Sequence, residues 1–220
     1  IAKGSEEGRY IGRTDSPLSA EGRKRLESLR RSGLYPKASI FYTSPLLRCR
    51  QTLALLYPGS EGRVVEGFQE CDFGDWEGKT AQELAAADSS FAQWMEGGTA
   101  VSPPNGESSA AFMHRVCETF ESFVTQIVKN REVESVLITH GGVIMTILSA
   151  YGLPQANFYD WMTESGCGYS IRIMPDLWMR TMKVEVFEKI PRGTEDSVRE
   201  EKMVIDLARE AADRAYGRES

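Results

Sequence analysis

Short apolar runs alternate along this chain with longer segments in which apolar residues recur every three or four positions. The runs at 39–43, 64–66 and 135–138 are rich in β-branched or aromatic residues, as buried strands are. The clearest helical period covers 107–129, where an apolar stripe predicts a long helix packed on a sheet. Further helices are predicted at 19–31, 44–57, 80–95 and 143–151. This alternation predicts a three-layer α/β/α sandwich with a mainly parallel sheet.

Serine residues mark two of the predicted helix starts. Ser19 is expected to cap the helix that follows it, and Ser44, followed by Pro45, is expected to cap the helix at 44–57. Arg48 then lies in the first turns of that helix and just beyond a strand. A guanidinium group at this place adds to the attraction of the helix dipole for an anion, although a solvated surface arginine is the alternative.

The last part of the sheet is predicted to be a hairpin. Residues 169–174 and 178–188 have strand patterns and are joined by a turn at Pro175 and Asp176. We expect residues 1–190 to form one domain. The remaining residues, 191–220, are expected to form a polar linker and an amphipathic helix, which either packs on that domain or begins a further one.

Composition narrows the classes of function. The formal net charge of −6 argues against a nucleic-acid binder, which needs a basic face. The four cysteines lie far apart without a C-x-x-C pair, so reduced thiols in a cytoplasmic protein are favoured over a zinc site or a disulfide framework. No apolar run approaches the roughly 18 residues of a membrane span, and no association with a membrane is expected.

The candidate chemistry gathers where predicted strands end. The strand at 135–138 leads into Thr139-His140-Gly141-Gly142, and ligands of open α/β sheets bind beyond the carboxyl ends of the strands. Guanidinium groups bind phosphate oxygens well, and arginines occur in the glycine-rich loop at 8–15 and at position 48. The loop at 68–78 mixes aromatic residues with carboxylates, a setting that raises the pKa of an acid. This set of groups suits phosphoryl transfer without a metal or cofactor.

Five motifs in order make the chain similar to a known family. They are GRYIGRTDSPLSAEG at 8–22, TSPLLRCRQT at 43–52, ECDFGDWEG at 70–78, GES at 106–108 and THG at 139–141. Together they resemble the histidine phosphatase superfamily in its phosphoglycerate-mutase-like branch 1, over nearly all of residues 1–188. The loop at 8–15 and the short insert at 97–105 look more like phosphatases of the α-ribazole type than like the glycolytic mutase.

The resemblance implies a phosphohistidine mechanism on a small phosphorylated metabolite. Arg48 would bind the transferring phosphoryl group, Glu70 would give a proton to the leaving group, and His140 would hydrogen-bond the phosphoryl oxygens. Contacts to the substrate are implied for Arg9, Gly12, Ser5 and Gly141. Mutase or sugar-bisphosphatase activity remains open on the same grounds.

One departure from the family pattern is large. The family's nucleophile is the histidine of an Arg-His-Gly motif that ends the first strand, and by spacing this motif would end immediately before Ile1. Neither that strand nor that histidine is in the sequence, and His114 lies on a helix at the wrong place in the order. The chain is therefore expected to be inactive by itself. It is either a truncated copy of an active phosphatase or a non-catalytic relative that binds a phosphorylated ligand.

The C-terminal segment carries a second, weaker resemblance. Residues 203–216 look like the opening helix of cytidine deaminases, without any of the zinc-site residues of that family. This resemblance would imply a further domain and no activity.

Overall fold

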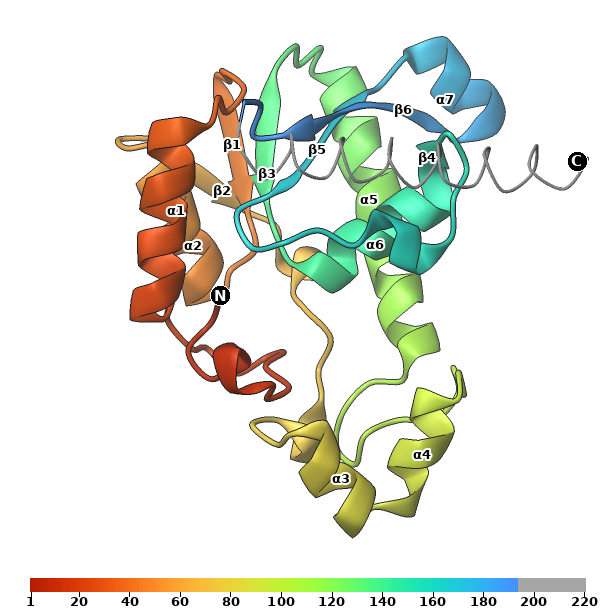
Figure 1. The fold of residues 1–220 in the computed structure, drawn as a ribbon. Coiled ribbons are helices and arrows are strands. Elements are labelled where there is room, and N and C mark those ends of the chain that lie inside the picture. The colour runs from red at the N-terminus through yellow and green to blue at the C-terminus, as the bar shows by residue number, and fades with distance from the viewer. Residues whose placement is uncertain (194–220) are drawn as a thin grey trace, which may run out of the picture.

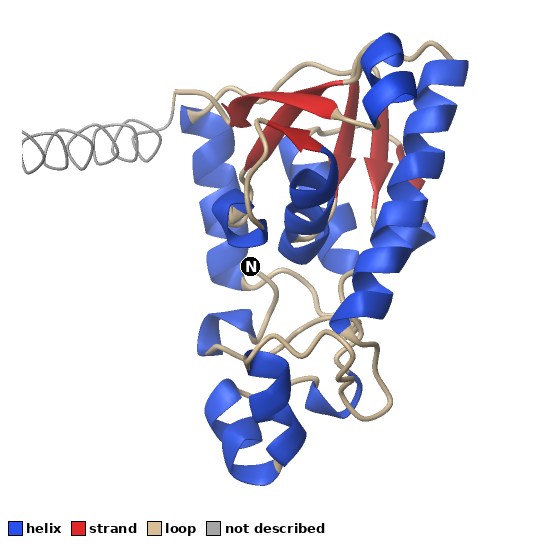
Figure 2. Ribbon diagram, turned by 90° about the vertical axis from the view of Figure 1, so that its right-hand side faces the viewer, coloured by secondary structure: helices blue, strands red, loops and turns tan. Residues whose placement is uncertain are grey.

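The computed structural model describes residues 1–193, so the expectations for the polar linker beyond residue 193 and for the amphipathic helix lie outside the described residues. Figures 1 and 2 show strands with helices on both sides, and two short helices set apart below them. Of the helices in the described part, none is long and apolar enough to cross a membrane.

The strands in residues 1–193 form two sheets of three. In the first, β1 (Ile40–Thr43) lies between β2 (Gly62–Val64) and β3 (Ser135–Ile138), and all three run parallel. In the second, β6 (Val184–Ile190) lies between β4 (Gly152–Leu153), which is parallel to it, and β5 (Gly168–Arg172), which is antiparallel. Within the described residues, β3 and β5 are edge strands, each paired on one side only.

Seven α-helices and four short 3-10 helices connect these strands in the described residues. The α-helices are α1 (Ala20–Ser32), α2 (Leu47–Leu56), α3 (Ala81–Ala87), α4 (Ser89–Met95), α5 (Ser109–Lys129), α6 (Gly141–Tyr151) and α7 (Pro175–Thr181). The 3-10 helices are η1 (Ser5–Glu7), η2 (Glu66–Phe68), η3 (Gly74–Trp76) and η4 (Phe158–Trp161). The predicted α/β fold with a parallel sheet and flanking helices is confirmed.

The main core lies between α5, α6 and the second sheet. The α5 stripe predicted from the sequence buries Val116 and Phe120, which join Val143, Ile147 and Val184 in one cluster. A separate aromatic cluster holds the small lobe of α3 and α4 below the sheets in Figure 1, and its buried members are Trp76, Leu84 and Phe91. This lobe follows directly from the loop that carries Glu70, so its packing anchors one side of that loop.

Four details of the sequence prediction were wrong. No tight hairpin turn joins the last two strands, because Pro175 begins the short helix α7, where its fixed φ fits the first turn. The helix predicted at 80–95 is two helices, since the Asp88 side chain accepts from Ser90 N and starts α4 anew. The strand predicted at 64–66 is β2, and Glu66 already belongs to η2.

The fourth detail concerns the start of α2. Ser44 does not cap this helix, which begins at Leu47, three residues later than expected. The cap is supplied from another part of the chain, since Asp15 Oδ1 accepts a hydrogen bond from Leu47 N at 2.7 Å. Ser19, in contrast, caps α1 as predicted by accepting from Gly22 N. The Ser44 hydroxyl instead accepts from Leu46 N at 3.3 Å and faces His140.

Candidate active site

His140 lies where β3 ends and α6 begins. Its ring is buried, and Nε2 lies 2.8 Å from Oγ of the fully buried Ser44, a hydrogen-bond distance. Because β1 and β3 are parallel neighbours, their carboxyl ends meet, and Ser44 N donates to Ile138 O across them. The Thr139 hydroxyl donates to Phe68 O at 2.9 Å and ties the same turn to the loop before Glu70.

The surroundings of His140 keep its imidazole neutral. Burial lowers its pKa to about 3, and the positive charges of Arg48, Arg115 and Arg13 act in the same direction. The thiol of Cys49 lies 3.5 Å from Nε2. Burial raises the pKa of Cys49 to about 12, so this neighbour is an uncharged thiol. His140 is therefore an uncharged hydrogen-bonding group at physiological pH.

Arg48 is the buried cation of the site. It lies in the first turn of α2, and its guanidinium donates to Gly12 O at 2.6 Å and to Thr14 O at 3.0 Å. Burial is the main cause that lowers its pKa, while nearby carboxylates, including Glu70, oppose the shift. The guanidinium still carries its charge at any physiological pH, since arginine starts from a pKa above 12. Both acceptors are neutral oxygens, which orient this charge without cancelling it.

Glu70 faces the first turn of α6. Its Oε1 accepts from Cys71 N at 3.0 Å, and its Oε2 accepts from Gly142 N at 3.3 Å. A Cβ at Gly142 would stand 2.6 Å from Glu70 Oε1, so only glycine lets the two come this close. Burial of the carboxyl group raises the pKa of Glu70, against the opposite effects of these two N–H groups and of Arg48. The raised pKa is the property that a proton donor needs.

The backbone that carries Glu70 is held by two arginines. Arg115, on α5, donates to the carbonyl oxygens of Gly67 at 2.7 Å and of Gln69 at 3.0 Å, and forms an ion pair with Glu107 at 2.6 Å. Arg13 Nε donates to Glu70 O at 3.1 Å. These groups fix the position of Glu70 from the side opposite its carboxylate.

The sequence analysis missed Ser44 and Arg115 as members of the site. The pattern offers no signal for Ser44, since a serine before proline looks the same whether it caps a helix or bonds to a distant imidazole. Arg115 had one usable signal: it is a cation next to the buried stripe of α5, shortly after the GES motif.

The predicted substrate contacts lie on several elements. Gly12 lies buried under Arg48, and Gly141 is the exposed first residue of α6, directly after His140. Ser5 is half-buried in η1. The Arg9 guanidinium contacts Glu7 at 2.8 Å, Glu83 at 3.4 Å and Gly78 O, on the side of the small helical lobe.

Two further groups bear on the chemistry of the site. His114 is exposed on α5 with Glu118 3.5 Å away, as expected for a residue off the buried stripe. The ammonium group of Ile1 donates to Ser165 Oγ at 2.6 Å. Burial is the main cause that lowers its pKa; the charge of Glu6 opposes this shift, and the charges of Arg25 and Arg48 add to it.

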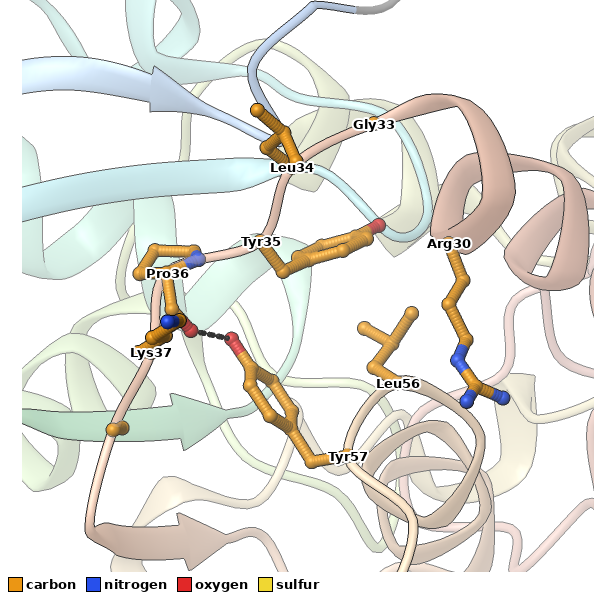
Figure 3. Close-up of a pocket in the computed structure, with 9 residues that line it drawn as sticks. Arg30, Gly33, Leu34, Tyr35, Pro36, Lys37, Leu56 and Tyr57 are labelled. Carbon is orange, nitrogen blue, oxygen red and sulfur yellow. Dashed lines mark hydrogen bonds between the residues drawn. The ribbon is translucent and has the colours of Figure 1, made fainter.

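A surface pocket of about 440 Å³ lies away from this cluster, between the ends of α1 and α2 (Figure 3). Tyr35 and Tyr57 line it, and Tyr57 Oη donates to Pro36 O at 2.7 Å. Its residue Ala38 precedes β1, whereas Ser44 follows β1. The pocket is therefore at the amino end of that strand, opposite the end that carries the candidate site.

Comparisons with known proteins agree with this geometry. The family model "Histidine phosphatase superfamily (branch 1)" matches residues 2–182. An adenosylcobalamin/alpha-ribazole phosphatase of Salmonella typhimurium is 29% identical over 174 residues, which cover 76% of this chain and 83% of the relative. A putative phosphoserine phosphatase 2 of Hydrogenobacter thermophilus is 29% identical over 155 residues, which cover 68% of this chain and 74% of the relative.

Solved structures show the same fold. A putative alpha-ribazole-5'-P phosphatase from Escherichia coli aligns with a TM-score of 0.71 at 20% identity, over 84% of this chain and 89% of that one. A phosphoglycerate mutase from Thermus thermophilus aligns with a TM-score of 0.61 at 26% identity, over 86% of this chain and 92% of that one.

Proposed function

The chain belongs to branch 1 of the histidine phosphatase superfamily, and from this we propose that it supplies the phosphate-binding and proton-donating groups of a metal-independent phosphomonoesterase. The observation that carries the proposal is that Glu70 accepts from Gly142 N, two residues after His140, while Cys49, the neighbour of Arg48, lies 3.5 Å from the His140 ring. A buried cation, a neutral imidazole and an acid with a raised pKa are the groups that metal-independent phosphoryl transfer requires.

In the proposed reaction, each of these residues has one role. The Arg48 guanidinium binds two oxygens of the phosphoryl group, and the neutral His140 ring hydrogen-bonds another. A nucleophilic imidazole nitrogen forms the bond to phosphorus while the bond to the ester oxygen breaks, and protonated Glu70 gives its proton to that oxygen. Water then attacks the phosphorus of the phosphohistidine, the P–N bond breaks to release inorganic phosphate and the free imidazole, and the Glu70 carboxylate takes up the proton that the water loses.

The nucleophile of this scheme is not supplied by either histidine of the 220-residue sequence. His140 is already bound to Ser44 at 2.8 Å, and His114 is exposed on α5. This observation favours a second candidate function for the chain as it stands, which is to bind a phosphorylated ligand without hydrolysing it. The same residues bind phosphate in both functions, so the two differ only in turnover.

The proposed substrate is a small phosphate monoester. The relatives are named as alpha-ribazole and phosphoserine phosphatases, which act on small phosphorylated metabolites. The loop at 8–15 favours the α-ribazole type for this chain, and mutase or sugar-bisphosphatase activity is the alternative within the family.

The test joins a strand ending in Arg-His-Gly directly before Ile1, where the spacing of the family's motifs places it. Hydrolysis of alpha-ribazole phosphate, phosphoserine and a chromogenic aryl phosphate is then measured at mildly acidic pH. We expect activity that disappears in the matched Arg-Ala-Gly fusion and in the Glu70→Gln and His140→Ala variants. Phosphate binding without hydrolysis in the Arg-His-Gly fusion would support the second function, and the absence of both would refute the proposal.

A further inference from the structure

The Glu77 carboxylate binds the loop that holds Arg48. Glu77 directly follows η3, and its Oε1 accepts from Gly12 N at 3.0 Å and from Arg13 N at 2.8 Å. Its Oε2 accepts from the Thr14 hydroxyl at 2.6 Å. One carboxylate therefore receives hydrogen bonds from three consecutive residues.

The carbonyl oxygens of the same loop hold the Arg48 guanidinium, at 2.6 Å from Gly12 and 3.0 Å from Thr14. The peptide group between Gly12 and Arg13 takes part in both contacts, because its carbonyl oxygen accepts from Arg48 and its N–H donates to Glu77. A negative charge at the N–H end and a positive charge at the C=O end polarise this peptide and strengthen both hydrogen bonds.

Gly12 packs tightly against the backbone of Cys71 and the Glu77 carboxylate. A Cβ at this position would stand 1.9 Å from Cys71 O and 2.7 Å from Glu77 Oε1. The end of the loop has its own attachment, since Asp15 caps α2 through Leu47 N at 2.7 Å. Glu77 therefore sets the middle of the loop, whose carbonyl oxygens aim the guanidinium, and Asp15 sets only its end.

We propose that Glu77 is a positioning residue for phosphate binding, which acts through the Gly12–Thr14 backbone on the Arg48 guanidinium. The inference rests on the proposed role of Arg48 as the phosphate-binding group. Glu77 itself lies behind the loop and repels an anion, so any gain in phosphate affinity that it gives must come through the geometry of Arg48.

The test is a calorimetric titration of the 220-residue chain with inorganic phosphate. In Glu77→Gln we expect the Kd for phosphate to rise about tenfold, the effect of one lost charge-assisted hydrogen bond. The matched control is Asp75→Asn, which lies in η3 two residues before Glu77. The Asp75 carboxylate accepts from Asn105 and does not contact the loop, so the Kd of this variant should not change. Thr14→Val should raise the Kd about threefold, because it removes one of the hydrogen bonds that tie the loop to Glu77, and Thr14→Ser should restore the Kd.

The titration distinguishes a role of Glu77 in positioning Arg48 from a role in stabilising the fold. A merely structural role for Glu77 would lower the fraction of binding-competent protein, and hence the fitted stoichiometry, while leaving the Kd unchanged. If Arg48→Ala weakens binding while Glu77→Gln and Thr14→Val do not, the inference about Glu77 is overturned and the proposed function stands. If Arg48→Ala leaves phosphate affinity unchanged, both are overturned. Thr14 is exposed, so its variants test the loop even where Glu77→Gln folds poorly.

Discussion

Lowering the pH from 7 to 5 should destabilise the protein through His140. The pKa of this residue is about 3 in the folded chain and about 6.5 in an unfolded one. The shift is a depression, so the stability that the neutral ring contributes is present above the unfolded pKa and is lost as the pH falls toward the folded one. Between the two values the unfolded chain binds a proton that the folded chain does not, and the free energy of unfolding decreases.

The size of the effect follows from the two pKa values. Between the two pKa values, each unit by which the pH falls lowers the free energy of unfolding by about 1.4 kcal/mol. The total loss from pH 7 to pH 5 is about 2 kcal/mol, because the unfolded chain begins to take up the proton only near pH 6.5. The result depends little on the exact folded value, since pH 5 lies well above it. The burial of the ring justifies using the full shift, because little solvent screens it.

The assay is urea unfolding at pH 7, 6 and 5 of the wild type and of His140→Gln, which keeps a polar group near Ser44 and cannot titrate. The stability of the wild type relative to the variant should fall by about 2 kcal/mol from pH 7 to pH 5. Parallel curves for the two proteins would show that His140 does not carry the depressed pKa and would refute the reasoning.

In the same experiment, Glu70→Gln should reveal a change of stability with pH that is opposite in direction to that of His140→Gln. The pKa of Glu70 is raised by burial, so its stabilising contribution is present below the ordinary carboxyl pKa and is lost as the pH rises through the folded value. The wild type should therefore lose stability relative to Glu70→Gln as the pH rises. If the stability of the wild type relative to each variant changed in the same direction with pH, the assignment of His140 as a neutral base and Glu70 as a buried acid would be contradicted.

Three substitutions test the packing that holds the site, each by urea unfolding at pH 7. Arg115→Ala should cost about 2 kcal/mol or more, because it leaves the half-buried Glu107 with only the longer ion pair to Arg13, at 3.9 Å, and leaves the carbonyl groups before Glu70 without their donor. Gly12→Ala should cost at least about 2 kcal/mol, since its Cβ would stand 1.9 Å from Cys71 O. Phe120→Ala should cost about 3 to 5 kcal/mol, as expected for a ring buried in the main core. A cost below about 1 kcal/mol in any of them would contradict the contact invoked.

The sequence predicted those parts of the fold that local patterns determine. The strand before His140 is a short apolar run that ends in glycines, and β3 lies there. The stripe of α5 places Val116 and Phe120 in the core, because a long period-3.6 pattern has only one way to bury its apolar face. The cap at Ser19 is also confirmed, because this contact is local: it joins residues three positions apart.

The parts that sequence could not predict depend on contacts between distant segments. The pattern around Ser44 is that of a cap, but the capping group of α2 comes from Asp15, and Ser44 contacts an imidazole 96 positions away. The sequence pattern gave no sign that the Arg9 guanidinium pairs with the carboxylates of Glu7 and Glu83, and its contact with the substrate stays a prediction. Pro175 suits both a turn and the first turn of a helix, and only the tertiary structure decides between them.

Arg48 and Arg115 show how one side-chain type can serve two purposes in this site. The Arg115 charge is matched by the Glu107 carboxylate at 2.6 Å, so its remaining N–H groups are free to hold backbone carbonyls without adding a net charge. Arg48 donates to the carbonyl oxygens of Gly12 and Thr14, which orient a guanidinium but do not neutralise it. An unneutralised cation in a site of low dielectric attracts an anion strongly, and its desolvation is a cost that a bound phosphate relieves. The acceptors around each guanidinium therefore distinguish Arg48, which is placed to bind an anion, from Arg115, which holds the backbone in place.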